Sequence, residues 1–302
     1  MKTILVTGGT VFVSRYIAEY YVKKGWEVYV LNRNTKRQSA GVKLIEADRH
    51  NIGNVLKGKH FDVVIDTGYT AEDVRCLLEG IDSCDDYIFI SSSAVYPEYN
   101  EQPFREEGTL GPNRFWGRYG TDKIEAEQVL TSGRPDAYIL RPPYLYGPMI
   151  NVYREAFVFE CALTGRKFYL PKEGRMKLQF LHIDDLCRFM DVLLEKKPKE
   201  RIYNVGNSDV ISIREWAEIC YEIAGRKAEF AEVDRDIEQR KYFSFYDYEY
   251  MLDVTRQHKL RPDDKPLEEG LKEAFEWYIH NKDSIVRKDY IGYIDEILTV
   301  RS

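Results

Sequence analysis

The sequence lacks several features that would assign a protein to a class at once. Its 302 residues include five cysteines, an odd number in which no two form a C-x-x-C pair. We therefore expect reduced core thiols in a cytoplasmic protein, without a disulfide framework or a metal site. No apolar run approaches the length that spans a membrane. The chain enters a strand pattern at once, so we also expect no secretory signal peptide.

The chain also lacks an excess of positive charge. Lys and Arg number 44 against 50 Asp and Glu, which gives a formal net charge of −6. A dedicated nucleic-acid-binding protein usually carries a basic excess, so the composition argues against that class, although a local basic patch stays open. Apolar residues (44%) are sufficient for a packed core. The length suits one large α/β domain or a core domain with a smaller lobe.

Glycine is missing where one common fingerprint needs it. Ile4-Leu5-Val6 has the length of a buried strand, Gly8-Gly9 follows, and residues 12–24 have helical spacing of aromatic residues. Such a strand, glycine turn and helix direct free helix N–H groups toward a phosphate. Val11 and Ser14 occupy the second and third glycine positions of Gly-x-x-Gly-x-x-Gly. Taken alone, this segment leaves open a dinucleotide-binding loop or an ordinary βα turn.

Short apolar strands alternate with helical patterns through the first half of the chain. This alternation predicts an α/β fold with a Rossmann-type, doubly wound parallel sheet. Strands are expected at 4–6, 27–31, 42–46, 62–66, 86–91 and 137–141, and helices at 12–24, 51–57, 71–81 and 118–130.

The pattern changes after Gly147-Pro148. We predict a dinucleotide-binding domain over residues 1–148, with returns to it near 179–205, and a smaller mixed α/β substrate lobe mainly over 149–302. Asp184 or Asp185 is expected to cap a helix that reaches Leu194. The other expected elements are helices at 152–163, 213–224 and 267–281, and strands at 167–170, 179–183 and 202–205.

Two segments point to chemistry. Tyr119 and Lys123 lie one turn apart on one face of an expected helix. An ammonium near a phenol lowers the phenol pKa from about 10, so Tyr119 is a candidate acid/base at neutral pH. The spacing is not specific by itself, because Tyr20/Lys24 and Tyr278/Lys282 repeat it. The serines at 91–93 follow the fifth strand, at the sheet edge where ligands bind in this fold, although such a cluster also suits a simple turn.

Together these motifs resemble the extended short-chain dehydrogenases/reductases, in the NAD-dependent epimerase/dehydratase family. The order and approximate spacing of the motifs match that family over most of the chain. The segments that carry the resemblance are Thr7-Gly8-Gly9-Thr10, Ser91–Tyr96, Tyr119-x-x-x-Lys123, Leu140–Pro148, Phe180–Asp185 and Tyr203–Gly206.

The resemblance implies roles for individual residues. Tyr119 would be the general acid/base, Lys123 would bind the nicotinamide ribose, and Ser92 would be the catalytic serine, with Ser93 as an adjacent alternative. Many dehydratases of the family carry Asp-Glu after that serine. Ser93-Ala94 follow here, so we expect epimerisation or carbonyl reduction. The residues expected at the cofactor are Gly8, Gly9, Thr10, Phe12, Val13, Asn32, Arg33, Asp48, Arg49, Thr67, Gly68, Lys123 and Pro142.

The end of the second strand favours NADP over NAD. NAD-binding folds usually place an acid there, on the ribose 2′-hydroxyl. Asn32 occupies this place, followed by Arg33, and an arginine beside an amide suits a 2′-phosphate. Alternatively, Arg33 with Lys36 and Arg37 is a solvated basic loop. Asp48 would lie at the adenine edge by resemblance, or simply cap its turn.

We therefore predict an NAD(P)-dependent epimerase or reductase that acts on a hydroxyl or carbonyl carbon of a small molecule. A nucleotide sugar is one candidate. Leu178-Gln179 weaken it, because sugar-nucleotide enzymes often place a diphosphate-binding arginine there. The alternative is a non-catalytic dinucleotide sensor or an RNA-associated protein, since chloroplast stem-loop RNA-binding proteins share the atypical glycine loop. By resemblance we also expect a homodimer through the helices near Ala71 and Arg118. His182 is interpreted as a core residue.

Overall fold

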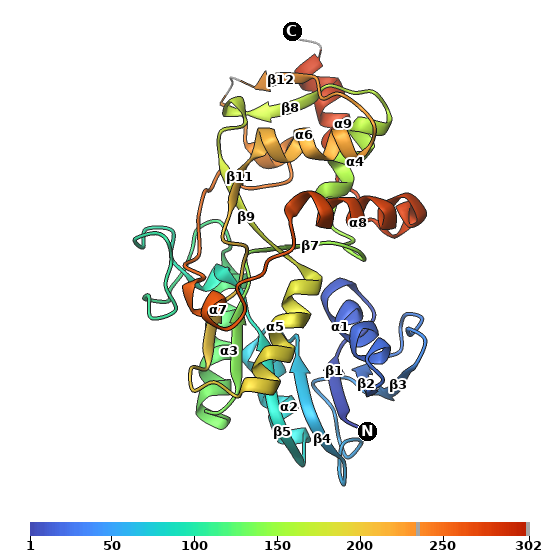
Figure 1. Cartoon of the computed structure of the whole chain (residues 1–302), viewed down its shortest axis with the longest axis vertical. Coiled ribbons are helices and arrows are strands. Elements are labelled where there is room, and N and C mark those ends of the chain that lie inside the picture. The colour runs from blue at the N-terminus through green and yellow to red at the C-terminus, as the bar shows by residue number, and fades with distance from the viewer. Residues whose placement is uncertain (234–235, 300–302) are drawn as a thin grey trace.

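A seven-stranded sheet organises the computed structural model, which describes residues 1–233 and 236–299 (Figure 1). Its strand order is β10-β6-β5-β4-β1-β2-β3, and every pair is parallel. The strands are β1 (Thr3–Thr7), β2 (Glu27–Asn32), β3 (Val42–Glu46), β4 (His60–Asp66), β5 (Ser83–Ile90), β6 (Tyr138–Arg141) and β10 (Ile202–Asn204). The order reverses between β1 and β4, and the crevice outside the carboxyl ends of these strands is where such sheets bind ligands.

Helices cover both faces of this sheet, as the doubly wound prediction requires. Side chains of α1 (Phe12–Lys23) and α5 (Ile183–Lys196) share one buried cluster with the strands, and those of α2 (Ala71–Gly80) and α3 (Arg118–Gly133) share another. The central strands are buried on both sides, which explains why they appear in the sequence as continuous apolar runs. The predicted α/β fold is confirmed.

The later part of the chain forms a smaller mixed body, drawn above the large sheet in Figure 1. One small sheet has the order β11-β9-β7, and a second pairs β12 with β8. Its strands are β7 (Tyr144–Tyr146), β8 (Phe168–Pro171), β9 (Lys177–His182), β11 (Val210–Ser212) and β12 (Phe230–Val233). Its helices are α4 (Glu155–Leu163), α6 (Ile213–Ile223), α8 (Leu267–His280) and α9 (Tyr290–Tyr293), while α7 (Thr255–Leu260) contacts β10 of the large sheet.

Three details of the sequence prediction are wrong. Residues 51–57 form no helix: Asn51 makes a β-bridge with Asp48, and turns follow from Gly53, whose φ of +59° a helix does not contain. Helix α5 is capped by His182, whose Nδ1 accepts a hydrogen bond from the backbone N–H of Asp184 at 3.3 Å. The strand near Gln179 is β9, which pairs with β7 and β11 instead of returning to the large sheet.

The five cysteines carry free thiols, and Cys161, Cys187 and Cys220 are buried. His182 is fully buried, in agreement with its interpretation as a core residue, and burial lowers its pKa to about 3. None of the helices in the two described ranges is long and apolar enough to cross a membrane.

Candidate active site

The glycine loop is shaped for close approach between β1, β2 and α1. Gly8 and Gly9 have φ values of +89° and +87°. A Cβ on Gly9 would lie 2.5 Å from Val30 Cγ1, and one on Gly8 would lie 2.8 Å from Ser14 Oγ. Ser14 is thus small enough to pack against Gly8, which explains the missing third glycine. Val11 has φ −135° and ψ 137°, a conformation that needs no glycine.

The first turn of α1 has backbone N–H groups that no side chain caps. Its N-cap is Val11, which provides no side-chain hydrogen bond, and no acidic residue lies in the first turn. The first N–H groups of a helix lack intrahelical partners and attract anions. This end of α1 therefore fits the diphosphate of a dinucleotide. The loop Gly8 to Val13, predicted at the cofactor, is brought to this point.

The end of β2 is held by Asn32. Its Nδ2 donates to the Gly8 carbonyl at 2.6 Å and to Gln38 Oε1 at 3.0 Å. A carboxylate could not donate these bonds, so the amide links β2 to the glycine loop in a way that aspartate cannot. The next residue, Arg33, is exposed, and within the described ranges it forms no ion pair.

Asp66, at the carboxyl end of β4, is the centre of a buried polar network. Its Oδ1 accepts from Thr7 Oγ1 at 3.0 Å, from the Gly68 N–H at 2.8 Å and from Arg49 Nη2 at 2.5 Å. Its Oδ2 accepts from Tyr87 Oη at 2.8 Å. The ends of β1 and β4 and the turn after β3 are therefore fixed relative to one another.

Arg49 and Asp48 were predicted at the cofactor, and both have local partners. Nη1 of Arg49 also lies 3.8 Å from Asp73 Oδ2, and these partners raise the pKa of Arg49 although burial opposes it. Asp48 accepts the backbone N–H of His50 at 2.9 Å, which is the turn-capping alternative considered for it. Contact of either residue with a cofactor stays a prediction.

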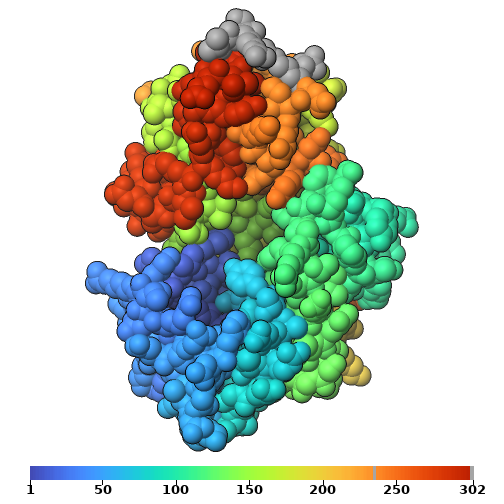
Figure 2. Space-filling model, turned by 180° about the vertical axis from the view of Figure 1, so that it is seen from behind, coloured from blue at the N-terminus to red at the C-terminus, as the bar shows by residue number. Residues whose placement is uncertain are grey.

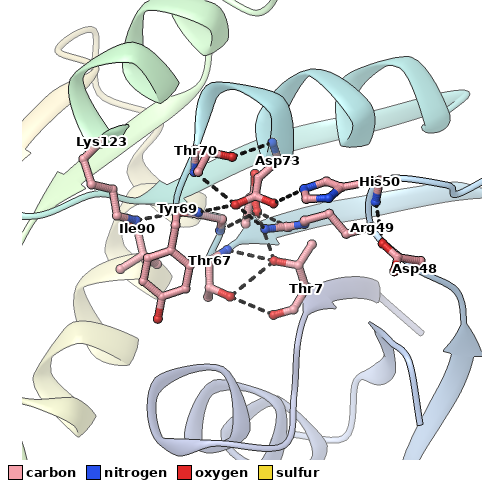
Figure 3. Close-up of polar contacts among 12 residues, drawn as sticks. Thr7, Asp48, Arg49, His50, Thr67, Tyr69, Thr70, Asp73, Ile90 and Lys123 are labelled. Atoms are coloured by element: carbon pink, nitrogen blue, oxygen red, sulfur yellow. Dashed lines mark hydrogen bonds and ion pairs between the residues drawn. The ribbon is translucent and has the colours of Figure 1, made fainter. Parts of the chain in front are cut away.

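Lys123 is a buried cation at the switch point. It is 2% exposed, and its Nζ donates to the carbonyls of Gly68 at 2.6 Å and Ile90 at 2.7 Å. The Tyr69 ring lies over the ammonium, 5.1 Å from Nζ (Figure 3). Burial lowers the pKa of Lys123 to about 8, although the Asp66 carboxylate opposes the shift.

The three serines after β5 have different partners. Ser91 Oγ donates to Glu127 Oε1, and Ser93 Oγ donates to Tyr250 Oη at 3.0 Å. Ser92 Oγ accepts the Ala94 N–H at 3.2 Å, which leaves its hydroxyl proton for another acceptor such as the Tyr119 oxygen. Ser91 and Ser93 line a cavity at the carboxyl ends of the strands, whereas Ser92 is not among its lining residues and acts on the Tyr119 phenol, whose pKa it lowers.

The expected effect of Lys123 on Tyr119 is absent in this arrangement. Desolvation raises the pKa of Tyr119 to about 12, and the hydrogen bond with Ser92 lowers it in part. This desolvation acts although Tyr119 as a whole is 39% exposed. Both hydrogen bonds of the ammonium go to backbone carbonyls, those of Gly68 and Ile90, instead of to the phenol. The lowered phenol pKa expected from Lys123 is therefore not seen in this conformation, and the acid/base role of Tyr119 stays a prediction.

A cavity of about 380 Å³ joins these groups. Figure 2 shows the molecule hollowed between its blue lower part and its orange and red upper part. The predicted residues Phe12, Val13, Thr67, Tyr119, Lys123 and Pro142 line the cavity. Several lining residues were not predicted from the sequence, among them Trp116, Tyr144, Arg154 and Tyr250. With 23 tyrosines in the chain, no single aromatic residue was distinctive.

Comparison with known proteins agrees with this geometry. The sequence profile of the NAD dependent epimerase/dehydratase family matches residues 4–206, about two thirds of the chain. This protein belongs to that family. The match includes the glycine loop, the serines after β5, Tyr119 and Lys123.

The relatives of this protein carry names that point to different functions. It is 28% identical to the chloroplast stem-loop binding protein of 41 kDa b from Arabidopsis thaliana, over 91% of this chain and 78% of the relative. It is 29% identical to GDP-L-fucose synthase from Escherichia coli (strain K12), over 65% of this chain and 67% of the relative.

Solved structures share the fold. A dTDP-glucose 4,6-dehydratase from Bacillus anthracis, in complex with NAD, superposes with a TM-score of 0.75 at 19% identity, over 94% of this chain and 99% of that one. A UDP-glucose 4-epimerase from Thermotoga maritima, with UDP-glucose, gives 0.73 at 20% identity, over 93% and 99%. At these identities the likeness concerns the fold.

Proposed function

We propose that this protein is an NADP-dependent epimerase or reductase that acts on a hydroxyl or carbonyl carbon of a small molecule. The observation that carries the proposal is the shared cavity: residues that follow the glycine loop line it together with Tyr119 and Lys123. A single cavity can thus receive the reactive end of a dinucleotide and a second molecule beside it.

The residues around the switch point fit a dinucleotide. The uncapped first turn of α1 would hold the diphosphate, and Lys123 would bind the nicotinamide ribose. The exposed guanidinium of Arg33 supports a 2′-phosphate, since it is free to form charge-assisted bonds. When bound, the nicotinamide supplies the hydride donor or acceptor.

The protein side of the chemistry is a proton transfer at the Tyr119 hydroxyl. With a pKa of about 12, this phenol is protonated at neutral pH and is poised to donate. A donor suits the direction in which a carbonyl oxygen becomes a hydroxyl, and Ser92, which hydrogen-bonds Tyr119, would bond the same oxygen. Oxidation would need the phenolate, and a reorientation of Lys123 toward Tyr119 would favour it.

Replacing Tyr119 by Phe tests this role. A panel of hydroxy and keto compounds is first screened for turnover, by the absorbance of the reduced nicotinamide. We expect Tyr119→Phe to lower kcat at least about 100-fold, the usual contribution of a general acid, with dinucleotide affinity unchanged. The matched control is Tyr99→Phe, at a tyrosine that is 76% exposed. Unchanged turnover by Tyr119→Phe would refute the mechanism.

A second candidate is an RNA-associated protein on the same fold. The relative named as a chloroplast stem-loop binding protein, which is aligned over 91% of this chain, favours it. The net charge of −6 and the retained serine, tyrosine and lysine count against it. Thermal stabilisation by NADPH and RNA binding at physiological salt, measured on the same preparation, separate the two. RNA affinity without dinucleotide stabilisation would favour the second candidate.

The homodimer through α2 and α3 also stays a prediction. The exposed positions of α2, Glu72, Arg75 and Glu79, are charged, so a dimer through this helix would have a polar interface.

A further inference from the structure

We propose that the substrate is a compact oxyanion, a hydroxy or keto compound that carries a carboxylate or a monophosphate, and that Arg154 binds this anionic group. The inference rests on the proposed function, since it concerns the second molecule in the cavity of Tyr119 and Lys123. It adds a substrate class and a specificity-determining residue to that function.

The charge of the cavity selects an anion. Its ionic lining residues are Lys123 and Arg154, and no aspartate or glutamate from the described part of the chain lines it. Both cations are withdrawn from solvent, at 2% and 8% exposed. Charges in such a place are screened little by salt, so they discriminate between an anionic and a neutral ligand more strongly than surface charges do.

Arg154 is held in place by hydrogen bonds but keeps hydrogen-bond donors that have no partner among the described residues. Its Nε donates to Glu155 Oε1 at 2.7 Å, and its Nη2 donates to the Leu145 carbonyl at 2.6 Å. The guanidinium lies over the rings of Tyr144 and Phe245, 5.5 and 5.6 Å from their centroids. Nη1 has no hydrogen-bond partner among the described residues. A guanidinium fixed on one edge, with donors left on the other, is arranged to receive an oxyanion.

Glu155 offsets part of the charge of Arg154 but does not occupy the site. It is 1% exposed and is absent from the cavity lining, so an incoming ligand meets the guanidinium and not the carboxylate. The carboxylate also stabilises the buried cation, which would otherwise be costly. The pair thereby fixes Arg154 in one orientation.

Aromatic rings connect the anion site to the reacting end. Ser93 Oγ bonds Tyr250 Oη at 3.0 Å, the Tyr250 and Tyr144 centroids are 5.8 Å apart, and Tyr144 packs on Arg154. Trp116 lies 6.0 Å from Tyr144, centroid to centroid. These rings offer apolar faces to the carbon skeleton of a small molecule.

Size and one missing cation argue against a nucleotide. A volume of about 380 Å³ is at the lower end for ligand sites, and the nicotinamide end must share it. Leu178, where sugar-nucleotide enzymes often have a diphosphate-binding arginine, is 1% exposed and packs in the core of the smaller body. At position 178 a diphosphate would meet a buried apolar side chain, whereas a single oxyanion has Arg154 in the cavity.

Calorimetry on the full chain saturated with NADP⁺ tests the inference with four probes: D-glucuronate, D-glucose 6-phosphate, neutral methyl glucoside and UDP-glucose. We expect at least one of the two small anions to bind about tenfold or more tightly than methyl glucoside, and the tighter one identifies carboxylate or monophosphate. Equal binding of anions and methyl glucoside, or tighter binding of UDP-glucose than of both anions, would overturn the inference.

The variant Arg154→Gln/Glu155→Gln removes the cation without leaving a buried carboxylate unpaired. The anion preference should fall to within about twofold, while the control Arg175→Gln, at an exposed arginine outside the cavity, keeps it. A preserved preference in the double variant contradicts the role of Arg154. If near-UV circular dichroism shows that the double variant is unfolded, Arg154→Lys replaces it. That variant should keep the anion preference only in part, and an unchanged preference would contradict the role equally.

The same titrations separate this inference from the proposed function. NADP⁺ binding is measured first, on the same sample. Absence of NADP⁺ binding would remove the proposed function. Normal NADP⁺ binding without a preference for anions would refute the proposed substrate class and the role of Arg154, and would leave the proposed function standing.

Discussion

Replacing Lys123 by Met should change how stability depends on pH. Lys123 is 2% exposed, and burial lowers its pKa from 10.5 to about 8, with Asp66 and Glu127 opposing the shift. Because the folded-state pKa is below the unfolded one, the unfolded chain binds more protons between about pH 8 and 10.5. Stability contributed at this site therefore rises with pH through that window. Below pH 8 Lys123 is charged in both the folded and the unfolded state, so the full free-energy cost of burying the ammonium lowers the stability.

The magnitude follows from the shift. A change from 10.5 to about 8 corresponds to about 3 kcal/mol of folding free energy at neutral pH. Between pH 7 and pH 10 roughly 2.5 kcal/mol of it is relieved. Lys123→Met also removes the hydrogen bonds to Gly68 and Ile90. The loss of these hydrogen bonds is the same at every pH. It shifts the stability difference between wild type and variant by a constant and does not change how that difference depends on pH.

Urea unfolding at pH 7, 8, 9 and 10 measures this difference. The free energy of unfolding of the wild type minus that of Lys123→Met should increase by roughly 2.5 kcal/mol from pH 7 to pH 10. The control is Lys199→Met, at an exposed lysine, for which the difference should stay flat. A difference that is flat for Lys123 too, or that falls with pH, would refute the reasoning.

Three further predictions concern the cofactor site and the core. Arg33→Gln should weaken NADP⁺ about tenfold or more and leave NAD⁺ within about twofold, measured by calorimetry; equal losses would exclude a 2′-phosphate contact. Arg141→Met should cost about 3–5 kcal/mol in urea unfolding, because it leaves buried Glu127 without its bidentate partner, and a loss below about 1 kcal/mol would contradict this. Gly9→Ala should be more destabilising than Gly25→Ala by about 1–3 kcal/mol, since both have positive φ but only Gly9 lacks space for a Cβ; equal losses in thermal unfolding would show that contact is unimportant.

The sequence predicts the large sheet well because its strands are buried on both faces and appear as unbroken apolar runs. β1 and β4 are clear examples. The strands β7 and β11 have three residues each, which is too short for any period to show. The segment 51–57 has a polar, helix-like pattern, but the left-handed conformation of Gly53 places it in turns, which the pattern does not reveal.

The site is predictable only in part, since its chemistry depends on partners far apart in the chain. Tyr119 and Lys123 are one helical turn apart, but the donors of Lys123 face carbonyls 33 and 55 residues away, which no local pattern reveals. Arg154 looks like one charge among many until folding places it over Tyr144. Asn32 could be located from the sequence, yet its bond to the Gly8 carbonyl requires the sheet.

The most direct test of the central claim is a calorimetric titration of the wild-type chain with NADP⁺ and with NAD⁺ at physiological salt. A dinucleotide site at the switch point between β1 and β4 predicts one saturable site per chain, with NADP⁺ about tenfold or more tighter than NAD⁺. Saturable binding of NAD⁺ with equal or higher affinity would contradict the role of Arg33. If neither NADP⁺ nor NAD⁺ shows saturable binding, the proposal that this protein is a dinucleotide-dependent enzyme is contradicted.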